Sequence, residues 1–112
     1  MKFDQPKASV LERRRWVPRH QCKVNARIAM DGHETVCVIR DISAGGIGIS
    51  FDAILRPAVN SRVIVTSMET GPATCVVRWV AGCTAGLQFV TSHGPSARVQ
   101  EFLAELAGES GF

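Results

Sequence analysis

Residues 23–51 read KVNARIAMDGHETVCVIRDISAGGIGISF, and this stretch decides the fold. Its first part alternates apolar with more polar residues, the period of two that marks a half-buried β-strand. The apolar members are Val24, Ala26, Ile28 and Met30. Asp31-Gly32 then supplies a tight hairpin turn, and residues 35–42 form a return strand rich in β-branched residues. The stretch therefore predicts an antiparallel hairpin.

The rest of the chain continues this pattern. A third strand is expected at residues 47–51, after two glycines, and Pro57 lies in the connection that follows it. Further strands are predicted at residues 62–68, 73–80 and 85–90. The period then becomes helical, with Pro95 near the start of the helix and Gly108 past its end. The helix places apolar residues on one face: Val99, Phe102, Leu103 and Leu106. We predict an all-β fold with one helix, a six-stranded antiparallel β-barrel followed by a C-terminal α-helix.

Length and composition predict one globular domain. The chain has 112 residues, of which 46% are hydrophobic and 21% charged. We expect a flexible N-terminal arm at residues 1–12, the domain at 13–108 and a tail at 109–112. No run of about 20 apolar residues that could span a membrane is present, and the N-terminus lacks a secretory signal, so the expected location is the cytoplasm.

Four cysteines raise the question of disulfides or a metal site. In a reducing compartment we expect them to be free thiols. They form no Cys-x-x-Cys pair, and the three histidines are scattered, so we expect no metal site.

Charge is distributed unevenly along the chain. Residues 1–28 hold eight Lys or Arg and two acidic residues, a net +6, whereas the remainder carries −3. This asymmetry suggests an anionic partner, which could be a nucleotide, a nucleic acid or a membrane surface, or else simply a solvated basic arm.

Arginines are concentrated in residues 13–19, RRRWVPR. Arginine presents a planar fork of donors that can grip a phosphate or a guanine edge with two hydrogen bonds. Pro18 disfavours a continuous helix through Val17. Arg15 and Arg19 are therefore expected on a turning segment that can aim both forks at one ligand.

A second cluster is Asp41-x-Ser43-x-x-Gly46. Its carboxylate can accept hydrogen bonds from the N1–H and N2 edge of guanine, its hydroxyl can bond a base or a phosphate, and glycine leaves space for a flat ring. Alone, it is better explained as a turn between two strands, capped by Asp41 and Ser43.

Together, Arg15-x-x-x-Arg19 and Asp41-x-Ser43-x-x-Gly46 resemble the PilZ domain family. The resemblance runs from about Arg13 to the final helix. It implies a receptor for cyclic di-GMP in which Arg15 and Arg19 contact guanine edges and phosphates. Asp41, Ser43 and Gly46 would close over the ligand. It further implies that Arg14, directly before the first motif, favours a stacked pair of ligand molecules. No other cofactor is expected.

Two more residues are candidates for the same site. Trp79 can stack on a purine, but strict alternation groups it with Cys75 and Val77 and favours a place in the core. Arg13 can assist electrostatically. Arg40 and Arg78 are expected to be solvated charges.

Enzymatic activity is not expected. Ser43 lacks the preceding glycine of a nucleophile elbow, and neither a His-Glu-x-x-His motif nor a P-loop is present. The expected partners are cyclic di-GMP and an unidentified effector protein, reached through a conformational change of the arginine segment. Two alternatives stay open. One is a small basic barrel that binds single-stranded nucleic acid, although nucleic acid is not the expected partner, and the other is a PilZ-fold protein-interaction module that does not bind nucleotide.

Overall fold

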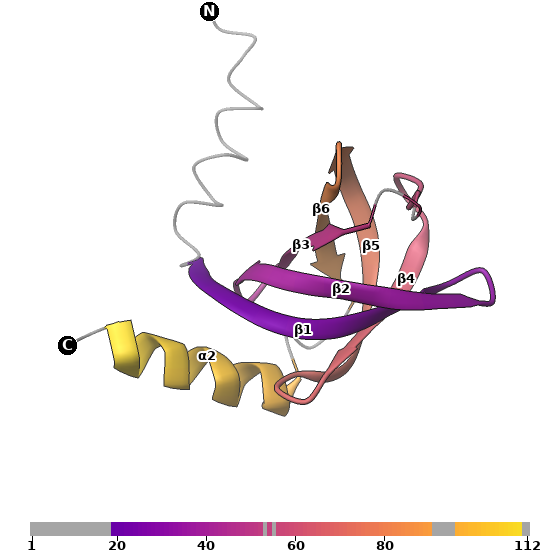
Figure 1. The fold of residues 1–112 in the computed structure, drawn as a ribbon. Helices are drawn as coiled ribbons and strands as arrows, with labels where there is room; N and C mark the ends of the chain where they lie inside the picture. The colour runs from indigo at the N-terminus through magenta and orange to yellow at the C-terminus, as the bar shows by residue number, and fades with distance from the viewer. Residues whose placement is uncertain (1–18, 53, 55, 91–95, 111–112) are drawn as a thin grey trace, which may run out of the picture.

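The barrel is built from six antiparallel strands. A computed structural model describes residues 19–52, 54, 56–90 and 96–110. The strands are β1 (His20–Met30), β2 (His33–Ile42), β3 (Gly46–Phe51), β4 (Arg62–Ser67), β5 (Gly71–Ala81) and β6 (Thr84–Phe89). They close in the order β1-β2-β3-β6-β5-β4, with helix α2 (Ala97–Ser110) after them (Figure 1). The predicted fold class is confirmed.

The β1–β2 hairpin forms where the sequence places it. Asp31 and Gly32 have φ values of 49° and 79°, the left-handed conformation that a two-residue hairpin turn of this type needs at both positions. Met30 pairs with His33 directly across this turn. The turn therefore fixes the register that sends alternate β1 side chains inward.

Branched aliphatic side chains fill the barrel interior. The most deeply buried are Ile28, Ile39, Ile42, Ile47, Ile49, Val63, Val65 and Val77. Such residues suit strands because their stiff side chains pack well on a pleated surface. Since a barrel of this size has an interior filled by side chains, ligands are expected on its outer face.

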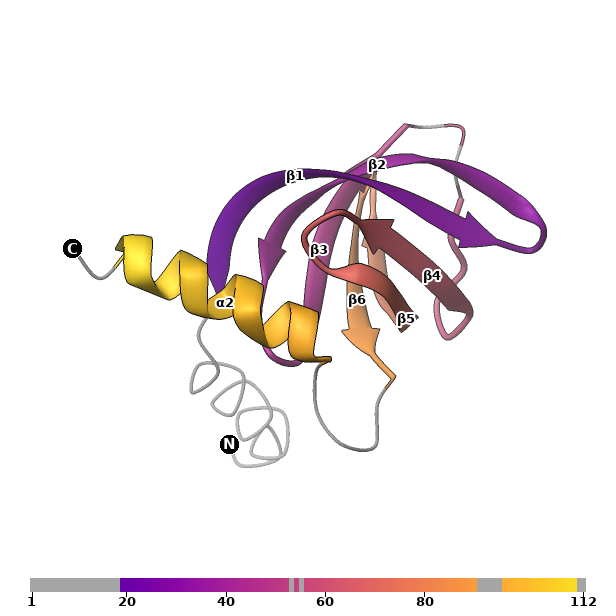
Figure 2. The ribbon, with the colours of Figure 1, turned by 90° about the horizontal axis from the view of Figure 1, so that it is seen from below.

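Helix α2 covers one end of the barrel, as the view from below shows (Figure 2). Ser96 caps it, since its hydroxyl accepts a hydrogen bond from the Val99 amide at 3.2 Å. Val99 is buried, and further residues of the same face pack on the core: Phe102, Leu103 and Leu106. The helix continues through Gly108 to Ser110, so the prediction that Gly108 lies past its end is wrong. An exposed glycine disfavours a helix by only about 1 kcal/mol, which does not force it to stop.

One side-chain contact joins the start of α2 to the sheet. The Arg98 guanidinium donates a hydrogen bond to the carbonyl of Met68, in the turn between β4 and β5. It also lies against Gly71, whose φ is 66°.

Within the described residues, no helix has the length and apolar character needed to cross a membrane.

Two cysteines are part of the core, on β2 and β5. Burial raises the pKa of Cys37 from 9.0 to about 11 and that of Cys75 from 9.0 to about 12. All four cysteines are free. The two buried thiols are therefore neutral at physiological pH and resist modification while the barrel is folded.

These raised pKa values predict a loss of stability in alkali. Above the ordinary thiol pKa of 9.0 the unfolded chain releases protons that folded Cys37 and Cys75 retain, so the free energy of unfolding should fall as pH rises from 9.0 through about 11 to 12. Urea unfolding across this range measures the effect, and the chain has no tyrosine to obscure it. The Cys37→Ala/Cys75→Ala variant should lose most of this dependence. An unchanged dependence in that variant would contradict the assignment.

Candidate functional site

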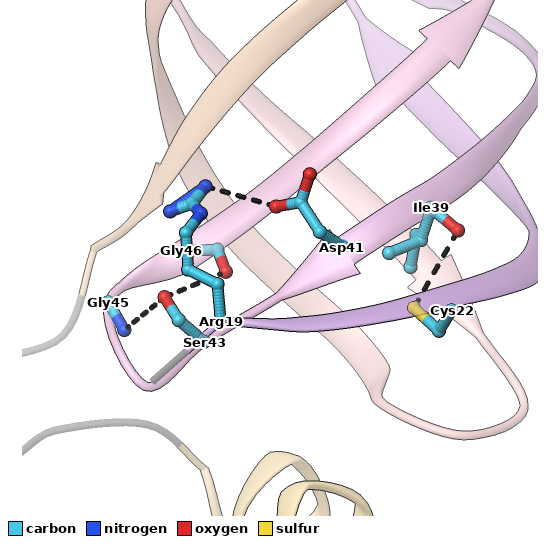
Figure 3. A network of polar contacts seen from close by, with 7 residues as sticks. All are labelled: Arg19, Cys22, Ile39, Asp41, Ser43, Gly45 and Gly46. Carbon is cyan, nitrogen blue, oxygen red and sulfur yellow. Dashed lines mark hydrogen bonds and ion pairs between the residues drawn. The ribbon is translucent and has the colours of Figure 1, made fainter. Parts of the chain in front are cut away.

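An ion pair brings the two sequence motifs together. Arg19 precedes β1 and Asp41 lies near the end of β2, and Arg19 Nη2 is 3.0 Å from Asp41 Oδ1 (Figure 3). The side chains are 48% and 30% exposed, so both can be reached from solvent. The structure thus brings one residue of each motif into contact.

The Asp41 carboxylate is incompletely satisfied. Its Oδ1 atom is buried yet accepts no hydrogen bond from any described residue. Arg19 Nη2 lies 3.0 Å from the same atom, so an ion pair balances its charge. Because Oδ1 is buried, a ligand N–H group would meet the exposed part of the Asp41 side chain.

Ser43 and Gly46 build the turn between β2 and β3. The Ser43 amide donates to the Gly46 carbonyl at 2.9 Å, and the Gly45 amide donates to Ser43 Oγ at 3.2 Å. Ser43 is only 3% exposed. Its hydroxyl is thus directed into the turn (Figure 3), as in the structural alternative that the sequence left open. A ligand would have to displace this turn to reach it.

Gly46 is required by the close approach of β3 to β6. A Cβ atom at this position would lie 2.0 Å from the carbonyl oxygen of Leu87. Backbone atoms in a paired strand cannot easily move aside. Within this motif Gly46 therefore serves the sheet.

Two β-bulges re-aim the strands that flank the β3–β6 pair. The register of β2 shifts between Ile39 and Asp41, and that of β5 shifts between Val77 and Trp79. A bulge inserts one extra residue and turns the following side chain to the other face. Arg40 precedes Asp41 in the first bulge, and both side chains lie outside the buried core, as do Arg78 and Trp79 at the second.

The core placement that alternation favours for Trp79 is wrong. Trp79 is 43% exposed and lies on the outer face, because the bulge interrupts the alternation that begins at Cys75 and Val77. Val80, which alternation places outside, instead packs on the core. The indole ring is therefore available to a ligand.

Two glycines separate Asp41 from Trp79 across the sheet. Asp41 pairs with Gly48 on β3, Gly48 pairs with Gly86 on β6, and Gly86 pairs with Trp79 on β5. We call this row of four residues the outer shelf. Neither glycine belongs to the two motifs. Glycine inside a strand often marks a place where a ligand or another part of the chain approaches the backbone closely. This is the only signal in the sequence that Gly48 and Gly86 belong to the site.

Charges around the outer shelf are mostly positive. Arg78 is exposed, and its Nε donates to Gln88 Oε1 at 2.5 Å. Arg40 is exposed beside Asp41.

The pKa of the Cys22 thiol is raised. Burial is the largest cause, and the negative charges of Asp41 and Glu69 add to it. This thiol stays neutral and donates to the Ile39 carbonyl at 3.8 Å, so it adds no negative charge to the site.

Several predicted site residues cannot be placed. Arg13, Arg14 and Arg15 lie outside the described residues. Their roles stay predictions. Over the part of the chain that is described, no three His, Cys, Asp or Glu side chains gather as metal ligands would.

Solved structures share this fold at low sequence identity. The Bacillus subtilis inhibitor of motility, MotI/DgrA, is 18% identical with a TM-score of 0.64, covering 84% of this chain and 50% of its own. The PilZ domain of CeSA from a cellulose-synthesizing bacterium is 12% identical with a TM-score of 0.63, covering 83% of this chain and 98% of its own. The K. pneumonia MrkH–c-di-GMP complex is 16% identical with a TM-score of 0.64, covering 85% and 52%. The present chain thus spans about half the length of MotI and MrkH.

A family model provides the stronger comparison. No curated protein matches the chain in sequence, but the model described as PilZ domain matches residues 12–105. This match covers both motifs, all six strands and most of helix α2. The chain therefore belongs to the PilZ domain family.

Proposed function

We propose that this protein is a non-enzymatic receptor for cyclic di-GMP, which it binds on the outer shelf beside Arg19. The observation that carries the proposal is the Arg19–Asp41 ion pair of 3.0 Å, whose side chains are 48% and 30% exposed and can therefore meet a ligand. In support, the similarly folded MrkH has been solved in complex with c-di-GMP. Family membership supports the same ligand.

The base that fits Asp41 is guanine. Guanine offers N1–H and N2 donors on its Watson–Crick edge, and a carboxylate accepts both. Adenine presents an unprotonated N1 acceptor at the corresponding place, which a carboxylate repels. Asp41 is therefore the group that selects guanine.

Arginines supply the matching positive charge. Arg19 holds Asp41 in place and presents its remaining donors to a phosphate or a guanine edge. We propose that Arg15 contacts the ligand in the same way, that Arg13 adds favourable charge and that Arg14 supports a second, stacked ligand molecule. Calorimetric stoichiometry reports directly whether one or two molecules bind.

Trp79 supplies a stacking surface on the same face. Base–aromatic stacking contributes about 1 to 3 kcal/mol per base. Trp79 pairs with Gly86, and Gly86 pairs with Gly48, so the exposed indole lies on the same row of the sheet as Gly48. We propose that a base of the ligand packs on this ring while its edge meets Asp41. Ser43 and Gly46 then act by holding the turn that positions Asp41.

Signal output requires a partner. We propose that ligand binding changes the conformation of residues 13–19, because the arginines there would bind the ligand phosphates. This change would alter the surface offered to an effector protein. Motility, exopolysaccharide and transcription machinery are all compatible classes of effector.

A calorimetric panel tests ligand choice. We expect saturable binding of cyclic di-GMP, and binding of cyclic di-AMP at least about 100-fold weaker, because a site built to accept hydrogen bonds strongly rejects a ligand that lacks the donors. GMP and a short single-stranded oligonucleotide are the further arms. Equal affinity for the two cyclic dinucleotides would refute the role of Asp41.

The same panel separates the alternatives. Tighter binding of the oligonucleotide, falling steeply with salt, would instead indicate a nucleic-acid-binding barrel. Folded protein that binds none of the four ligands would indicate a protein-interaction module. Either result would overturn the proposed function.

A further inference from the structure

Gly48 and Gly86 occupy the centre of the outer shelf. Their neighbours in sequence, Ile47, Ile49, Ala85 and Leu87, are buried in the barrel, so alternation directs both glycines outward. They are paired with each other across β3 and β6. Two adjacent outward positions of the sheet thus carry no side chain of their own.

Functional side chains cover both positions. A Cβ atom on Gly86 would lie 2.1 Å from Trp79 Nε1 and 2.5 Å from its Cε2. A Cβ atom on Gly48 would lie 2.5 Å from Asp41 Oδ2. The indole and the carboxylate therefore rest directly on glycine backbone, in neighbouring positions and from opposite flanks.

We propose that Gly48 and Gly86 are positioning residues of the nucleotide site, a role that rests on the proposed binding of cyclic di-GMP. The glycines let the Trp79 ring and the Asp41 carboxylate lie flat against the barrel. A purine base can then stack on the indole while its donor edge reaches the carboxylate. A side chain at position 48 would push the Asp41 carboxylate away from the barrel, and one at position 86 would push the Trp79 indole away. The two groups would then no longer lie at the same height above the sheet.

The nature of the blocking atoms distinguishes this role from a structural one. At Gly46 the obstruction is a backbone carbonyl, so a substitution there disturbs the sheet. At Gly48 and Gly86 the obstructing atoms belong to the side chains of Asp41 and Trp79, which can swing into solvent. The barrel should therefore tolerate alanine at both positions while ligand affinity falls.

The two bulges explain why these side chains reach the glycines. Without the register shift in β2, strict alternation after Ile39 would direct Asp41 inward, and the same holds for Trp79 after Val77. Each bulge thus delivers one functional side chain to the outer face beside one glycine. This symmetry about the β3–β6 pair shapes a site for a flat ring.

A double-mutant cycle between Gly86 and Trp79 tests the proposal. Calorimetry gives the Kd for cyclic di-GMP in wild type, Gly86→Ala, Trp79→Ala and the double variant. We expect Gly86→Ala to weaken binding about 10-fold, the scale of one lost base–aromatic stack. In the Trp79→Ala background the same substitution should change Kd by less than about 2-fold, because no ring remains to displace.

Thermal unfolding of the four proteins shows whether the barrel survives. Gly86→Ala should unfold cooperatively near the wild-type temperature. If it is strongly destabilised, Trp79→Ala must restore its stability, since the clash is with the indole. A destabilisation that persists in the double variant would overturn the proposal.

Trp79 fluorescence provides an independent readout of ring position. In a Trp16→Phe background, Gly86→Ala should shift the emission to longer wavelength as the indole moves into water. Gly48→Ala should weaken cyclic di-GMP binding without this shift, because it displaces Asp41 and not the ring. Gly108→Ala is the control for the exchange of glycine for alanine, since a Cβ there has no neighbour within 4 Å.

Failure of this proposal differs from failure of the proposed function. If wild-type protein does not bind cyclic di-GMP, the receptor function itself is wrong. If wild type binds but Gly86→Ala has no effect, or has equal effects with and without Trp79, only the role of the glycines is wrong.

Discussion

Arg19→Ala is expected to weaken cyclic di-GMP binding at least about 30-fold. Removing one partner of a charge pair that is buried in a complex costs about 2 to 5 kcal/mol, and each 1.4 kcal/mol is about tenfold in Kd. The free energy of unfolding should change by less than about 1 kcal/mol, because the Arg19–Asp41 pair is partly exposed. Calorimetry and urea unfolding measure the two effects separately.

Arg27→Ala is the matched control for this variant. Arg27 also forms an ion pair, at 3.3 Å from Glu34, with side chains 56% and 53% exposed. It pairs with Thr66 on β4, on the side of the barrel opposite the β3–β6 pair. Its loss should leave ligand affinity unchanged. Similar losses in both variants would mean that arginines act only through net charge.

Gly46→Ala should have the largest effect on stability among the motif residues. The new Cβ would lie 2.0 Å from the Leu87 carbonyl oxygen and 3.1 Å from Gln88 Cα, so β3 and β6 must separate. Overpacking of this kind costs about 1 to 3 kcal/mol, and sometimes more. Urea unfolding should show a lower midpoint. Ligand affinity should fall in parallel, because Asp41 lies near the end of β2 that the same turn joins to Gly46 on β3.

The neighbouring glycine supplies the control. A Cβ on Gly45 would meet only Ser43 Oγ, at an ordinary 3.9 Å. Gly45→Ala should therefore leave the unfolding midpoint nearly unchanged. If both variants lost the same stability, the turn as a whole, and not the close approach of β3 to β6, would be responsible.

The sequence was sufficient for most of the fold because local signals agreed with the global structure. Asp31-Gly32 has the left-handed conformation that its turn requires, and the alternation in β1 and β3 matches the buried core. The end of the helix was misplaced because Gly108 is exposed and its conformational cost is small. Such a residue weakens a helix without ending it.

Trp79 shows why the site was harder to predict than the fold. A bulge depends on which residues of β5 face which residues of β6, and period-two alternation within one strand carries no information about this pairing. The same limit applies to Gly48 and Gly86. Their importance follows from the partner strands that place Asp41 and Trp79 over them.

The second motif contains residues of two kinds. Ser43 and Gly46 shape the turn and the sheet, whereas Asp41 is partly exposed and forms an ion pair with Arg19. Sequence spacing alone could not separate these roles, since a strand-end turn and a ligand contact use the same residue types. The structure assigns the hydrogen bonds of Ser43 to the turn itself.

The most direct test of the account is a titration of ¹⁵N-labelled protein with cyclic di-GMP, followed by NMR. The Trp79 indole N–H signal, identified from the spectrum of Trp79→Phe, should shift together with the Gly48 and Gly86 amides and saturate at a common ligand concentration. The amides of Arg27 and Thr66, on the opposite side of the barrel, should stay in place. Saturable binding that leaves the Trp79, Gly48 and Gly86 signals unmoved would contradict the outer shelf as the binding site.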